Sequence, residues 1–124
     1  MSLKELKASV ALGEDSRRQF KRDITNADSL AAEMAAFANS EGGMIFIGVA
    51  DDGTLPGLDK ADVARLHQLI GNAASQNVRS PLAVQTKNIA VGKGRVVIML
   101  CIPKGMDKPY FDRNRYHLAE MRRR

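Results

Sequence analysis

The pattern of apolar and polar positions is clearest between residues 35 and 53, AAFANSEGGMIFIGVADDG. Apolar residues recur at helical spacing before the Gly-Gly pair at 42–43, so the pattern predicts an amphipathic helix that ends near Asn39. Either glycine can take the left-handed conformation that closes a helix. The unbroken apolar run at 44–49 predicts a strand covered on both faces, near the middle of a sheet. The Asp-Asp-Gly at 51–53 has the chemistry of a tight turn.

The same reading places three elements before this stretch. Residues 1–12 have apolar positions at helical spacing and predict a short amphipathic helix. Residues 18–24 alternate and predict a short, half-buried strand. Thr25 or Asn26 can cap the helix that follows, because both side chains accept hydrogen bonds from a first helical turn.

The second half of the chain predicts one more helix and a hairpin. Asp59 can cap a helix that frays through residues 72–77. Alternation from residue 82 and a continuous apolar run to residue 102 predict two strands joined by a Gly-Lys-Gly turn at 92–94. These strands are expected to pack against the central strand, and residues 110–111 are expected to open a last short strand. His67 falls beside the apolar face of the helix, where a rim position is the favoured interpretation.

Together these elements predict one compact α+β domain over residues 1–124, with a mixed, mainly antiparallel sheet and two or three helices. The chain is 44% hydrophobic, and 124 residues suit a single core. The lone Cys101 lies in an apolar run and is expected to be a buried small hydrophobe. A single cysteine cannot form an internal disulfide, so we expect a reducing, cytoplasmic setting. No apolar run reaches the ~18 residues of a membrane span, so we expect no membrane partner. The exposed edges of a small sheet make a homodimer an expectation as well.

The net charge is +5, from 19 basic and 14 acidic residues, and the basic residues are clustered. The candidates for phosphate contacts are Arg17, Arg18, Lys21, Arg22, Lys104, Lys108 and Arg113. Such clusters suit a polyanion, because neutralised phosphates release counterions. A solvated, solubilising surface explains the same clusters equally well, so charge alone leaves both interpretations open.

The two glycine segments do not form a phosphate-binding loop. A P-loop places GxxxxGK[ST] between a strand and a helix, so that backbone amides and the helix N-terminus hold the phosphates. Here residues 42–43 follow a helix and precede a strand, and residues 92–94 join two strands. Both segments are therefore expected to be structural turns.

Three acidic residues are candidates for chemistry: Glu14, Asp51 and Asp52. Two carboxylates that converge at a sheet edge could hold a divalent cation and activate water for phosphodiester cleavage. Asp51 and Asp52 are also explained as turn formers, and the sequence does not show whether the acids converge.

Several motifs together resemble a known family. They are Glu14 with Gln19-Phe20-Lys21, the AFANSEGGMIFIGVADDG stretch, Gly57, and Lys108-Pro109-Tyr110-Phe111. This combination, over roughly residues 13–111, resembles the Schlafen-type AlbA-like domain, a DNA-binding module once labelled a divergent AAA-type ATP-binding domain.

The resemblance implies an α+β fold and a nucleic-acid-binding module of a bacterial transcriptional regulator, with DNA or RNA as partner. Some Schlafen proteins are similar to metal-dependent ribonucleases that use two Glu residues and an Asp. Those positions fall on Glu14, Gln19 and Asp51, so the middle position is an amide, which brings no negative charge to a Mg²⁺ or Mn²⁺ site. A binding module without a cofactor is therefore the favoured hypothesis, with a ribonuclease and an ATP-binding module as alternatives.

Overall fold

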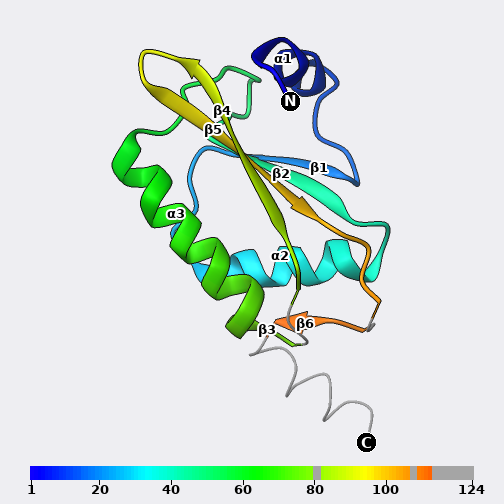
Figure 1. Cartoon of the computed structure of the whole chain (residues 1–124). Coiled ribbons are helices and arrows are strands. Elements are labelled where there is room, and N and C mark those ends of the chain that lie inside the picture. Colours follow the sequence, from blue (N-terminus) through cyan, green and yellow to red (C-terminus); the bar gives the residue numbers. More distant parts are fainter. Residues whose placement is uncertain (80–81, 107–108, 113–124) are drawn as a thin grey trace, which may run out of the picture.

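The computed structural model describes residues 1–79, 82–106 and 109–112 (Figure 1). Its elements in chain order are α1 (Leu3–Ala11), β1 (Arg18–Lys21), α2 (Ala27–Asn39), β2 (Gly43–Ile47), α3 (Lys60–Asn72), a π-helical turn η1 (Ala73–Asn77), β3 (Val78–Arg79), β4 (Gln85–Gly92), β5 (Arg95–Ile102) and β6 (Phe111–Asp112).

The main sheet has the strand order β1-β2-β5-β4. β2 lies inside the sheet, parallel to β1 and antiparallel to β5, and β4 completes a hairpin with β5. Ile45, Phe46 and Ile47 are fully buried, so β2 is the two-sided central strand that its apolar run predicts. The α+β prediction and the mixed, mainly antiparallel sheet are confirmed.

Local chemistry sets the helix ends. The Asn26 side chain caps α2 by accepting from the backbone N–H groups of Asp28 and Ser29, which decides between the two predicted caps. Asp59 caps α3, as predicted. Gly42 follows α2 with a φ of +79°, and its N–H donates to the carbonyl of Phe37 at 2.8 Å. The conformation is the left-handed one that glycine adopts without steric cost.

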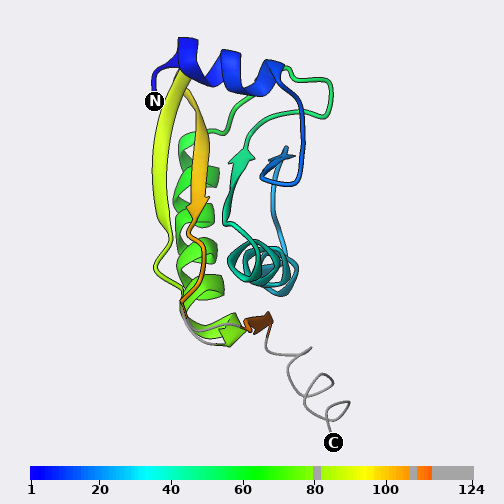
Figure 2. The same cartoon turned by 90° about the vertical axis from the view of Figure 1, so that its right-hand side faces the viewer.

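The sheet separates two apolar clusters. The larger cluster lies between the sheet and α2 and α3, and includes Met34, Leu66 and Leu100. The smaller cluster lies on the other face, where Leu6 of α1 packs over Phe46 and its neighbours. Figure 2 shows α1 crossing one end of the sheet, so this face is covered at that end by α1.

Three predictions differ from the structure in detail. The segment predicted to fray at 72–77 is the π-helical turn η1, because Ala73 and Ala74 are buried and the Ala74 carbonyl accepts from the Leu82 N–H at 3.0 Å. β4 begins at Gln85 rather than Leu82 and continues to Gly92. The last short strand is β6, which begins at Phe111 rather than at residue 110, and it pairs with β3 in a separate two-stranded sheet.

Cys101 is partly exposed, which corrects the prediction of a buried residue. It alternates along β5 with Leu100 and Ile102, which enter the larger cluster, so its side chain lies on the face that α1 crosses. Partial burial raises the pKa of the Cys101 thiol. Within the described ranges, no helix has the length and apolar character needed to cross a bilayer.

Candidate nucleic-acid interface

Alternation along β1 sends its side chains to opposite faces of the sheet. Phe20 enters the smaller cluster, on the α1 side. Lys21 points the other way and forms an ion pair with Glu33 of α2, with 2.8 Å between Nζ and Oε1. Because side chains alternate with a period of two, Gln19 shares the α2 side with Lys21.

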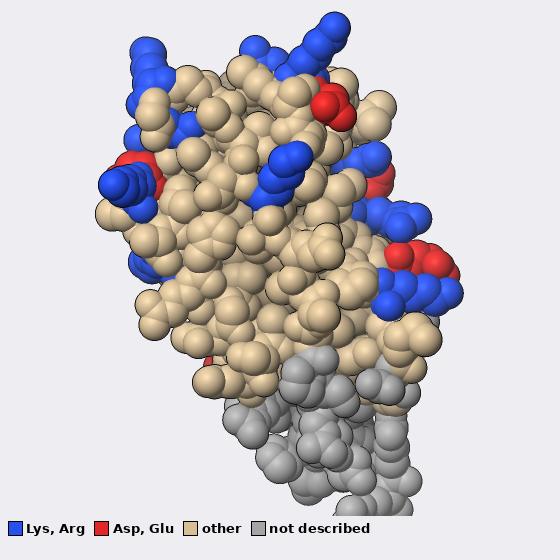
Figure 3. Space-filling model, viewed as in Figure 1, with Lys and Arg blue, Asp and Glu red and all other residues tan. Residues whose placement is uncertain are grey.

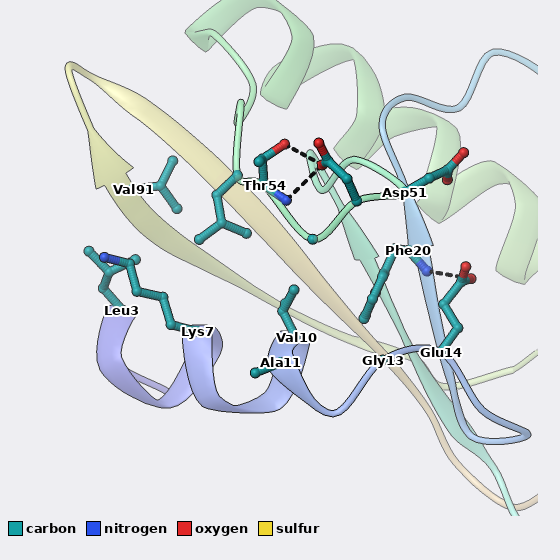
Figure 4. Close-up of a pocket in the computed structure, with 13 residues that line it drawn as sticks. Leu3, Lys7, Val10, Ala11, Gly13, Glu14, Phe20, Asp51, Thr54 and Val91 are labelled. Atoms are coloured by element: carbon teal, nitrogen blue, oxygen red, sulfur yellow. Dashed lines mark hydrogen bonds between the residues drawn. The ribbon is translucent and has the colours of Figure 1, made fainter.

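Glu14 and Asp51 line one cavity of about 750 Å³ on the α1 side (Figure 4). Its wall includes Lys7 and Val10 of α1 and the turn at 51–55. The Glu14 carboxylate accepts a hydrogen bond from the Phe20 N–H at 3.1 Å, which holds this acid to the start of β1.

Asp52 acts as a turn former, as its sequence context predicts. Its Oδ1 accepts from the N–H of Thr54 at 3.0 Å and from the Thr54 hydroxyl at 2.6 Å. These bonds favour the charged carboxylate, and the side-chain bond is the largest cause of the lowered pKa of Asp52. The Ala50 carbonyl accepts from the Gly53 N–H at 2.9 Å and closes the turn.

Gln19 lies in a different cavity, between β1 and α2, together with Glu33 and Ser40. Its Oε1 is buried and has no hydrogen-bond partner within the described part of the chain. The sheet therefore stands between Gln19 and the cavity of Glu14 and Asp51. Among residues 1–79, 82–106 and 109–112, no three His, Cys, Asp or Glu side chains are placed to hold a metal ion. The three positions of the ribonuclease set are thus divided between two cavities, with Glu14 and Asp51 in one and Gln19 in the other.

The structure instead brings together basic residues from two distant segments. Arg17 and Arg18, at the start of β1, and Lys104, just after β5, line one cavity of about 410 Å³. We call these three residues the basic end of the sheet. Figure 3 shows Lys and Arg side chains interspersed with acids along the right-hand edge, where Figure 1 places the start of β1 and the chain after β5.

Acidic neighbours hold the basic end in place. The Arg18 guanidinium forms an ion pair with Asp15 at 2.9 Å, and Lys104 contacts Glu41 at 3.5 Å. Arg17 donates to the backbone carbonyl of Glu41 at 3.1 Å. The pKa of Asp15 is lowered, first by the hydrogen bond from the Arg17 N–H and then by the charge of Arg18. The exposed Lys104–Glu41 contact is weak, because water and salt screen such pairs.

The remaining predicted phosphate contacts are distributed differently. Lys21 is engaged with Glu33, as described above, and exposed Arg22 contributes to the lowered pKa of Asp52 on the other face. Lys108 and Arg113 lie outside the described residues. His67 is a rim residue, as predicted, and its Nε2 contacts the side-chain oxygen of Asn88 on β4 at 2.9 Å.

Sequence reasoning named Arg17, Arg18 and Lys104 but missed their common location. The pairing of Gly43 with Ile102 brings these segments together, because it places the residues before β2 beside those after β5. The same cavity wall includes two acids, Asp15 and Glu41, and the apolar Met44, and none of these was predicted as a site residue.

Comparison with known proteins adds a family and a fold. The model of the family "Schlafen, AlbA_2" matches residues 14–123. A similar solved structure is the solution NMR structure of the N-terminal domain of a RecG-related protein, named for an ATP-dependent DNA helicase, from Nitrosomonas europaea. The two chains are 19% identical, with a TM-score of 0.64, over 91% of this chain and 81% of the other. Curated proteins give no significant match.

Proposed function

The chain belongs to the Schlafen AlbA_2 family, and on that premise we propose that it is a nucleic-acid-binding module whose basic end contacts the phosphate backbone. The observation that carries the proposal is the convergence of Arg17, Arg18 and Lys104 on one cavity from segments far apart in sequence. Cations held at fixed positions on a sheet suit the regular charges of a polyanion.

The ion pairs at the basic end are compatible with this role. Lys104 and Glu41 have side-chain exposures of 56% and 66%, so a phosphate can compete for the ammonium group. Arg17 uses one guanidinium nitrogen for the Glu41 carbonyl, and a guanidinium has further donors for a phosphate oxygen. Lys108 and Arg113 remain proposed contacts on the basis of the sequence alone.

The wider context of the module is a further part of the proposal. We place the module in a bacterial transcriptional regulator that works in the cytoplasm, with DNA or RNA as its partner. The similar solved structure comes from a protein whose name refers to a DNA helicase, which supports a nucleic-acid setting. A homodimer through β4 is a separate proposal, because β4 is an edge strand of eight residues and edge strands pair readily with a second copy.

A salt titration tests the binding proposal. Fluorescence anisotropy with a labelled oligonucleotide should show a log-log decline of affinity with salt concentration. The double variant Arg17→Ala/Lys104→Ala should reduce that slope by about 1.4 for a single strand, at about 0.7 per phosphate contact. The matched control is Lys60→Ala/Lys93→Ala, which removes two exposed charges elsewhere. A flat salt response, no binding at low salt, or an equal loss in the control would contradict the proposal.

A further inference from the structure

The strand register places two rows of side chains on the face that α1 crosses. One row runs Arg18, Met44, Cys101, Gln85 across β1, β2, β5 and β4. The next row runs Phe20, Phe46, Met99, Lys87 in the same strand order. Directly paired residues share a face, so each row is continuous across the sheet.

The helix α1 covers this face only in part. Its residues Leu6 and Val10 belong to the same cluster as Phe20 and Phe46, which are buried. Three sulfur-containing side chains in the two rows stay partly exposed, and they are Met44, Met99 and Cys101; the two methionines pack against the edge of the smaller cluster. We call these three, with Arg18, Gln85 and Lys87 around them, the open face.

The open face has an apolar centre between cationic edges. Met44, Met99 and Cys101 provide soft, polarizable sulfur atoms that make favourable contacts with aromatic rings. Arg18 stands at the β1 edge, beside its partner Asp15, and exposed Lys87 stands at the β4 edge. The two rows contain no acidic residue. Arg18 and Met44 also line the cavity of the basic end, so the two surfaces are continuous.

We propose that the open face receives the unpaired bases of a single-stranded nucleic acid whose phosphates are held at the basic end. This inference rests on the proposed function and adds the strandedness of the ligand and the path that it takes. A duplex presents its charged backbone and keeps its bases stacked inside, so an apolar centre offers it little. A single strand can turn its base faces onto the sheet while its backbone follows the cations.

A second copy of the chain suits the open face less well. Two copies packed through this surface would bring Lys87 of both chains toward Arg18 of both chains, where each Arg18 already has its acid partner in Asp15 and has no further acid in the two rows. Like charges brought together at an interface disfavour association. A polyanion with exposed aromatic rings complements both the charge and the apolar centre.

Cys101 is the only cysteine of the chain and reports directly on the open face. The rate of Cys101 alkylation is measured at fixed pH with and without a single-stranded oligonucleotide. At a ligand concentration of ten times Kd, mass action predicts roughly tenfold slower alkylation if the bound strand covers the thiol. The control is Cys101→Ser/Ala64→Cys, whose reporter is exposed on α3, and its alkylation rate should not change. A duplex of the same sequence should leave the Cys101 rate almost unchanged.

The outcomes separate this inference from the proposed function. Salt-dependent binding at the basic end without protection of Cys101 overturns the open-face proposal and leaves the proposed function intact. No binding at low salt overturns both. Protection that rises with protein concentration in the absence of oligonucleotide shows that a second copy covers the face, which also overturns the proposal.

A pair of isosteric variants provides an independent test that does not depend on the thiol. Gln85→Glu puts a negative charge in the first row of the open face, whereas Gln68→Glu puts the same charge on α3. Both residues are exposed, so both variants should fold. Gln85→Glu should weaken single-strand binding several-fold more than Gln68→Glu does. Equal affinities of the two variants would overturn the proposal.

Discussion

The carboxamide of Asn39 holds the main chain of Tyr110, 71 residues away in sequence, in two hydrogen bonds. Its Nδ2 donates to the Tyr110 carbonyl at 2.8 Å, and its Oδ1 accepts from the Tyr110 N–H at 2.6 Å. The end of α2 is thereby fastened to the segment after β5. Both residues belong to motifs that resemble the family, so one contact explains two separate parts of the sequence pattern.

Asn39→Ala should destabilise the protein by about 1–3 kcal/mol, because it removes both partners from part-buried backbone groups. Urea unfolding followed by circular dichroism measures the change. Asn72→Ala is the matched control, because Asn72 is exposed and makes no capping bond, and it should change stability by less than about 0.5 kcal/mol. Equal losses in the two variants would show that the contact with Tyr110 contributes nothing.

Gly42→Ala should cost more stability than Gly94→Ala. Both glycines have positive φ values, +79° and +71°, so an alanine at either position should lower the free energy of unfolding by about 1–2 kcal/mol. At Gly42 a Cβ atom would also lie 2.6 Å from the Ile102 carbonyl oxygen and 2.8 Å from the Lys104 nitrogen, whereas at Gly94 it meets nothing within 4 Å. The difference between the two unfolding free energies therefore measures the contact between the α2–β2 corner and the end of β5. Similar values would contradict that close approach.

The lowered pKa of Asp15 predicts a specific loss of stability in acid. A carboxyl group whose pKa is lower in the folded state binds fewer protons there than in the unfolded chain. Its contribution is complete above the unfolded value of about 4 and is lost as the pH falls through the folded value. The stability difference between the natural protein and Asp15→Asn should therefore shrink as urea midpoints are measured at falling pH below about 4. A difference that is constant across this range would contradict the role of Asp15.

Gln19→Glu should not create a metal-dependent ribonuclease. The new carboxylate would lie in the cavity beside Glu33, on the opposite side of the sheet from Glu14 and Asp51. Incubation of structured RNA with this variant and Mn²⁺ or Mg²⁺ should leave the RNA intact. Cleavage that appears in Gln19→Glu and disappears in Gln19→Glu/Glu14→Ala would mean that the acids do converge on RNA.

Local patterns predicted most of the elements. The stripe before Asn39 and the turns at 51–53 and 92–94 lie where the sequence placed them, and the strand predicted over 44–49 is β2, at Gly43–Ile47. These features depend on neighbours in sequence, because helical and strand periodicities are short-range properties. The sequence did not predict the elements β3 and η1. The two-residue strand β3 carries too few residues for a periodic signal, and η1 forms because Ala73 and Ala74 are buried by distant parts of the chain.

By itself the sequence determined the type of each major element, the turns that join them and the family. Only the tertiary structure decided which side chains meet. The alternation of β1 put Gln19 on the α2 side and Phe20 on the α1 side, which divides the candidate metal ligands between two cavities. The pairing of β2 with both β1 and β5 placed Arg17 and Lys104 in the wall of one cavity. Both results have one physical reason: contacts between distant segments decide which strands pair and which helix covers each face of the sheet, and the alternation within one strand does not record this.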